Sequence, residues 1–213
     1  MRLESATSVS LESRRISVAH LEKMTSQKLN LAYAARIQQL IDQISQEFEN
    51  LDLPDGLLVA DGLGDDSGRE RINEAFGKIP WTSVPEDVLT SMFDATDLSH
   101  HVSARGFCYY LPAFMRTILK RRNFGWFERL LVPPVDGFED VAKYFGDGSL
   151  YPYDSAFVGR QRERILYAFN NFGVRQRSCV ADYIDIAENY SNASPTPEFL
   201  ALLKKYTNFW RQQ

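Results

Sequence analysis

One apolar stretch near the middle of the chain, residues 106–120, constrains the fold more than any other feature. It reads Gly-Phe-Cys-Tyr-Tyr-Leu-Pro-Ala-Phe-Met-Arg-Thr-Ile-Leu-Lys. Because burying one large apolar side chain contributes about 1.5–3 kcal/mol, such a run belongs in a protein core. We therefore expect the rest of the chain to pack around it. The predicted core residues are Trp81, Phe107, Tyr109, Tyr110, Leu111, Pro112, Phe114 and Met115.

Ser103 and Pro112 determine the local structure that we expect in this region. A serine side chain can accept a hydrogen bond from a backbone N–H in the first turn of a helix. Proline has no backbone N–H and suits the first turn of a helix, where that group would be unpaired in any case. The sequence therefore predicts a short helical turn carrying Phe107 and Tyr110, a break at Leu111, and a new helix from Pro112.

Apolar residues at spacings of three and four predict further helices along the chain. The predicted segments are 31–50, 67–76, 85–96, 126–131, 138–145, 154–172, 180–190 and 196–210. Ser83 and Glu86 have the spacing of a capping box before the third of these segments. Strict alternation of apolar and polar residues is absent, so no β-hairpin is expected. We predict an all-α fold, a single irregular helical domain of about eight helices over residues 30–213.

Residues 1–29 differ from the rest in composition. They are rich in serine and threonine, and their apolar residues are few and scattered. Such a segment buries too little apolar surface to fold tightly on its own. We expect a weakly structured N-terminal arm or an extra helix, and Met24 is an alternative start of translation.

The overall composition indicates an ordinary globular protein of the cytoplasm. Hydrophobic residues make up 44% of the chain and charged residues 24%. No apolar run approaches the roughly 20 residues that a membrane helix requires. The N-terminus lacks the apolar region of a secretory signal. Cys108 and Cys179 each have apolar neighbours, so two buried free thiols are expected.

Acidic residues are concentrated in one part of the chain. Residues 38–100 carry 14 acidic and 3 basic side chains, whereas residues 101–213 carry 11 acidic and 15 basic side chains. A strongly acidic surface attracts a basic partner and disfavours nucleic acid. We expect a basic protein partner to bind here, although charge runs are also common on solvated helix faces. The predicted contact residues are Asp61, Asp65, Asp66, Glu70, Glu74, Asp94 and Asp97.

Four motifs follow one another in an order that points to a known family. They are Ile72-x-x-x-Phe76, Lys78-x-x-Trp81, Phe107-x-Tyr109-Tyr110-Leu111-Pro112-Ala113-Phe114-Met115, and a late helix from Asp154 to Phe169 containing Gln161. Over residues 37–172 this order resembles a family of uncharacterised bacterial domains with a central Tyr-Tyr-Leu-Pro-Ala core. The resemblance implies a bacterial, mostly helical module and brings no catalytic residue. Some small bacterial domains of this kind act as antidotes to toxins, so we expect a non-enzymatic immunity protein.

Two other functions remain open at the level of the sequence. Cys108 with His100 or His101 could serve a cysteine-dependent hydrolase, although apolar neighbours raise the pKa of a thiol and disfavour this chemistry. Clustered arginines could bind nucleic acid weakly. The two clusters are Arg116, Lys120, Arg121 and Arg122, and Arg160, Arg162, Arg164, Arg175 and Arg177.

Neither a metal nor a cofactor is expected. The two adjacent histidines would point in different directions on a helix and could not readily bind the same ion. The aspartates of residues 61–66 are suitable oxygen ligands for calcium, but their spacing is not that of an EF-hand loop. The glycines in that loop are accompanied by carboxylates, which would repel a phosphate.

Overall fold

The computed structural model of the chain describes residues 30–53, 70, 76, 79–94, 102–122, 155–190 and 197–212. The chain divides into two compact units, Met1–Gln39 and Leu40–Gln213. A helix over residues 30–47 begins in the first unit and ends in the second. In the first unit Ile37 is buried and Leu31 is exposed. The predicted arm of residues 1–29 lies outside the described residues.

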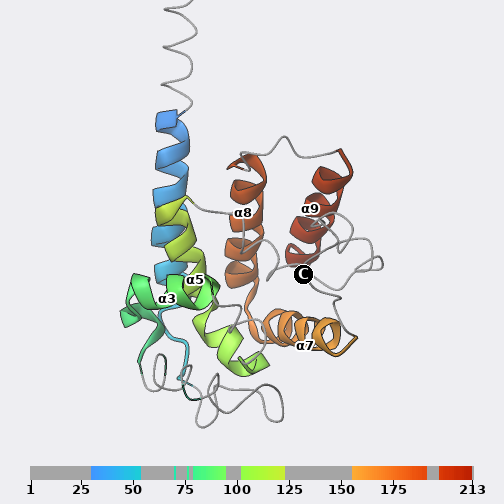
Figure 1. Cartoon of the computed structure of the whole chain (residues 1–213). Coiled ribbons are helices and arrows are strands. Elements are labelled where there is room, and N and C mark those ends of the chain that lie inside the picture. The colour runs from blue at the N-terminus through green and yellow to red at the C-terminus, as the bar shows by residue number, and fades with distance from the viewer. Residues whose placement is uncertain are drawn as a thin grey trace, which may run out of the picture. The chain divides into compact units, whose positions relative to one another are not determined.

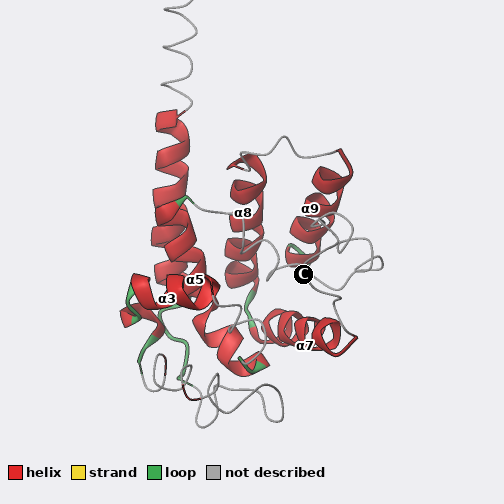
Figure 2. Cartoon of the chain, in the orientation of Figure 1, coloured by secondary structure: helices red, strands yellow, loops and turns green. Residues whose placement is uncertain are grey.

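The described part of the second unit is helical. Besides residues 40–47, its elements are the 3₁₀ turn η1 (Trp81–Ser83) and the helices α3 (Glu86–Asp94), α5 (Ala104–Arg121), α7 (Ser155–Asn171), α8 (Val174–Tyr190) and α9 (Pro197–Trp210). None of the residues that the structure describes forms a β-strand (Figure 2). The predicted all-α class is confirmed. Six α-helices are described where about eight were predicted, and the predicted segments 126–131 and 138–145 lie outside the described residues.

Helix α5 is continuous, and the predicted break at Leu111 is wrong. Pro112 lies inside the helix. Because proline has no N–H, the carbonyl of Cys108 lacks its usual partner one turn later, and a proline at such a position costs about 3 kcal/mol. Leu111, Phe114 and Met115 are almost completely buried. The burial of several such side chains, at about 1.5–3 kcal/mol each, exceeds the cost of the proline.

The middle of α5 is also enclosed on every side. All ten residues from 106 to 115 are buried, which is nearly three full turns of the helix. A helix that is apolar all round occurs where other elements surround it. α5 packs against η1, α3 and α7. All the residues predicted to form the core are therefore buried, and those in α5 lie on every face of the helix.

Local hydrogen bonds close both ends of α5. Ser103 Oγ accepts the backbone N–H of Gly106 at 3.0 Å, which is the cap that the sequence predicted. At the other end Arg122 has a left-handed conformation, with a φ of 55°, and its N–H donates to the carbonyl of Ile118 at 2.7 Å. Lys120 and Arg121 in the last turn interact favourably with the negative pole of the helix.

Tyr110 of α5 holds the segment that precedes η1. Its hydroxyl lies 2.9 Å from the carbonyl of Phe76 and 2.8 Å from the carbonyl of Ile79, so its hydrogen is shared between the two. The ring of Tyr110 packs on Phe76 with centroids 4.8 Å apart. A phenylalanine would fill almost the same volume but could not donate to these carbonyls. The hydroxyl therefore explains the tyrosine in this apolar stretch.

Trp81 joins three parts of the second unit. Its backbone N–H donates to the Tyr109 hydroxyl at 3.4 Å, and its indole N–H donates to the carbonyl of Phe48 at 3.2 Å. The guanidinium of Arg116 lies over the indole, 5.5 Å from the ring centroid. Trp81 is only 2% exposed. This side chain thus connects α5 to the chain that follows the helix of residues 30–47.

The C-terminal helices form an aromatic layer. α8 and α9 pack side by side and run in opposite directions, and α7 packs against α5 (Figure 1). Phe172, just after α7, contacts Phe48 with ring centroids 5.0 Å apart. Phe169 of α7 contacts Phe209 and Trp210 of α9. These rings link the ends of three helices.

Two helix boundaries differ from those predicted. α3 begins at Glu86, and Ser83 belongs to η1, so the predicted capping box does not start this helix. Val84 is extended and separates the two elements. α8 begins at Val174, six residues before the predicted segment 180–190. Its first turn is polar, and the apolar pattern on which the prediction was based begins later.

Replacing Ser103 by alanine should lower the free energy of unfolding by about 1 kcal/mol, because the N–H of Gly106 would lose its acceptor. Urea denaturation followed by circular dichroism measures this change. Ser103→Thr keeps a hydroxyl acceptor and should retain most of the stability. Equal losses in the two variants would contradict the capping role.

Replacing Tyr110 by phenylalanine should lower the free energy of unfolding by about 1–3 kcal/mol, because two carbonyls would lose their shared donor. Tyr109→Phe is the matched control on the same helix. Its hydroxyl takes part in one longer hydrogen bond, at 3.4 Å, so the loss should be smaller. A larger loss for Tyr109→Phe would contradict this assignment.

Candidate functional site

The structure describes only two of the seven predicted contact residues. Glu70 is helical and exposed. Asp94 is the last residue of α3, and its side chain is outside the described part. The remaining predicted contacts also lie outside it: Asp61, Asp65, Asp66, Glu74 and Asp97. Within the acidic region, four of the carboxylates whose side chains the structure describes lie in residues 40–53.

Residues 40–53 form an acidic helix end, which we define by Asp42, Glu47, Glu49 and Asp52. This segment contains no lysine or arginine. Asp42, Glu49 and Asp52 are exposed. The helix ends at residue 47, so Glu47 and Glu49 lie at the pole of the helix that already carries negative partial charge, and Asp42 lies more than one turn before it. Negative side chains there are unfavourable unless a positive group compensates them.

One such group comes from α8. Arg175, in the first turn of α8, lies 3.6 Å from the carboxylate of Glu47. The side-chain amide of Gln176 donates to the carbonyl of Glu47 at 2.9 Å and accepts the N–H of Gly173 at 2.9 Å. The negative end of one helix thus meets the positive end of another. The Arg175 side chain is 82% exposed, so the ion pair itself contributes little.

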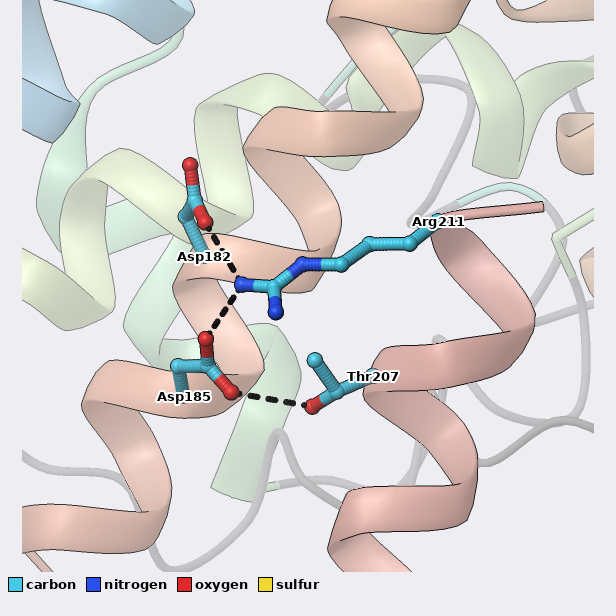
Figure 3. Close-up of polar contacts among 4 residues, drawn as sticks. All are labelled: Asp182, Asp185, Thr207 and Arg211. Atoms are coloured by element: carbon cyan, nitrogen blue, oxygen red, sulfur yellow. Dashed lines mark hydrogen bonds and ion pairs between the residues drawn. The ribbon is translucent and has the colours of Figure 1, made fainter. Parts of the chain in front are cut away.

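A second polar cluster, which the sequence analysis did not predict, joins α8 to the C-terminal end of α9 (Figure 3). Arg211 Nη2 donates to Asp182 Oδ1 at 3.1 Å and also to Asp185 Oδ2. Thr207 Oγ1 donates to Asp185 Oδ1 at 3.2 Å. Two carboxylates from α8 therefore meet one donor from α9, Thr207, and one from the residue that follows α9, Arg211.

This cluster orients the two helices and contributes modestly to their stability. The side chains of Arg211, Asp182 and Asp185 are 47%, 32% and 25% exposed, and exposed ion pairs contribute about 0–1 kcal/mol. Tyr206 and Trp210 of α9 are almost fully buried and contribute more. The spacing of three residues between the aspartates was a visible signal that they share a helix face. No pattern in the sequence indicated that Arg211 pairs with them.

Cys108 does not have the surroundings of a nucleophile. It is 6% exposed in the middle of α5, and burial raises the pKa of its thiol to about 12. Cys179 is also buried and free, and burial likewise raises its pKa to about 12. Two buried free thiols were the state predicted. His100 and His101, the proposed bases, lie outside the described residues.

The two arginine clusters differ in their surroundings. Arg121 and Arg122 are exposed at the end of α5. In the second cluster, Arg164 is only 2% exposed and the guanidinium of Arg177 lies 4.5 Å above the ring of Phe169. The second cluster therefore does not present one continuous basic surface.

Neither a metal site nor a membrane-spanning helix is found among the described residues. Within them, no three side chains of histidine, cysteine, aspartate or glutamate come together in a way that could hold a metal ion. In the same part of the chain, none of the helices has the length and apolar character needed to cross a membrane.

Thiol labelling tests the assignment of the two cysteines. At pH 8 both thiols should react with a maleimide or disulfide reagent far more slowly than in the unfolded chain, because they are buried and almost fully protonated. Addition of urea should expose two thiols together. Cys179→Ser isolates Cys108, and fast labelling of native Cys108 in that variant would contradict its burial.

Comparison with protein-family models, with curated proteins and with solved structures finds no match to this chain. The resemblance based on the central motif therefore stays a prediction.

Proposed function

We propose that this chain is a non-enzymatic, helical protein–protein interaction module that binds a basic partner through the acidic surface of residues 42–97. The proposal includes a biological role, that of a bacterial immunity protein acting in the cytoplasm against a basic toxin. That role rests on the sequence resemblance.

The observation that carries the proposal is the acidic helix end. Residues 40–53 carry four carboxylates and no basic residue, and Glu47 and Glu49 lie at the negative pole of the helix. Such an arrangement lowers the stability of the isolated molecule, and a positively charged partner would reverse the effect. Arg175 compensates Glu47 in part, while Glu49 and Asp52 extend the acidic surface beyond the helix.

The properties of the described residues are consistent with a binding role. Cys108 is buried and burial raises the pKa of its thiol, which argues against its use as the nucleophile of the alternative hydrolase. A field of one sign steers a partner of opposite charge and rejects partners of like charge. Charge complementarity of this kind contributes mainly to association rate and specificity.

The test uses the product of the gene adjacent to that of this protein, provided that the product is basic. Binding is measured by calorimetry at low and at physiological salt. Glu49→Lys with Asp52→Lys should weaken binding by about tenfold or more, and Asp65→Lys, Asp66→Lys and Glu70→Lys together should do the same. Association should also slow as salt is raised.

Glu163→Lys is the matched control for Glu49→Lys alone, because it makes the same change of charge at an exposed position of α7 outside residues 42–97. It should leave the affinity nearly unchanged. If the control weakens binding as much as the acidic-surface variants, only net charge matters and the proposed site is wrong. Protection of growing cells against the adjacent gene product, lost in the same variants, tests the immunity role.

A further inference from the structure

A group of positive side chains surrounds one carboxylate on the surface of α3 and α5. Lys120 Nζ lies 2.8 Å from Glu86 Oε1. Arg116 lies one turn before Lys120 on the same helix face, and Arg121 follows it. The pKa of Glu86 is lowered, first by the hydrogen bond from Lys120 and then by attraction to Lys120, Arg121 and Arg116. All three cations are therefore close enough to act on this carboxylate.

The cations outnumber their described counter-charge. Glu86 neutralises one of the three, which leaves an excess of positive charge on this surface. The negative pole of α5 accounts for some of that excess, but the pole carries only about half an elementary charge. Arg116 is oriented by the indole of Trp81, which it covers at 5.5 Å. The surface is thus partly organised before any ligand arrives.

We propose that Arg116, Lys120 and Arg121 form a binding site for the carboxylates of an acidic protein segment, and that Glu86 occupies this site in the free molecule. Glu86 and Lys120 have side chains that are 42% and 44% exposed, so the internal contact is open to exchange with solvent and with a ligand. This surface goes beyond the proposed function, because it attracts negative rather than positive groups.

The described surroundings favour a peptide carboxylate over nucleic acid. The group that the site already holds is a carboxylate. Binding of single-stranded nucleic acid usually includes stacking of bases on exposed aromatic rings. Trp81, the aromatic ring that Arg116 covers, is 2% exposed. Within the part of the chain that the structure describes, the site therefore offers charge and hydrogen-bond donors, and the ring beside Arg116 is not open for stacking.

A polyglutamate peptide of about eight residues is the probe, since several weak contacts along one chain add up to measurable binding. Fluorescence anisotropy of the labelled peptide gives the affinity of the full chain at low salt. Glu86→Gln should strengthen binding about threefold, because the internal competitor is removed. Arg121→Gln should weaken it about threefold, as expected for one exposed ion pair.

Lys205→Gln on α9 is the control, because it removes one exposed positive charge outside the cluster. It should leave the affinity unchanged within error. All changes are at exposed or half-exposed positions, and circular dichroism checks that each variant is folded. Loss of affinity in Lys205→Gln equal to that in Arg121→Gln would overturn the proposal, as would unchanged or weaker binding by Glu86→Gln.

An oligothymidine of similar charge identifies the ligand class. It should bind more weakly than the peptide, both to the unmodified protein and to Glu86→Gln. Tighter binding of the oligonucleotide, strengthened by Glu86→Gln, would make this a phosphate site and overturn the assignment to carboxylates. If the peptide does not bind at millimolar concentration, the cations serve only to stabilise the end of the helix, and the proposal is likewise overturned.

Discussion

The all-round burial of α5 is the constraint on which the rest of the second unit depends. An ordinary surface helix has one apolar stripe and needs neighbours on one side. Residues 106–115 of α5 are buried throughout, so neighbours are needed all round. η1, α3 and α7 supply part of this enclosure. The hydroxyls of Tyr109 and Tyr110 then bond to backbone groups of the surrounding chain, which adds direction to a contact that apolar burial alone would leave unspecific.

The sequence predicted the helical class and the buried centre because both follow from the spacing of apolar residues. It failed at Pro112, where the local preference for a helix start competes with the burial of Leu111, Phe114 and Met115 on both sides of it. Tertiary packing prevailed over the local preference there. The early start of α8 was missed for a related reason, since its first turn is polar and shows no apolar periodicity.

Charge was harder to interpret from the sequence than hydrophobicity. The count of acidic residues located the acidic region, but it could not reveal that Glu47 lies beside Arg175, 128 residues further along the chain. In the same way, Arg164 and Arg177 belong to one basic cluster in the sequence. In the fold, however, Arg164 is buried and Arg177 lies over the ring of Phe169. The pairing of Arg211 with two aspartates of α8 depends on how the two helices pack, which spacing alone does not give.

The two hydrogen bonds of the Gln176 side chain limit which amino acids this position can accept. Its amide nitrogen donates to a carbonyl at the end of one helix, and its amide oxygen accepts a backbone N–H at the start of another. Glutamate would keep the oxygen and lose the donor, and lysine would keep a donor and lose the oxygen. Asparagine has both groups on a shorter arm. In a family of such chains, glutamine should therefore be nearly invariant here, although its side chain is only half-buried.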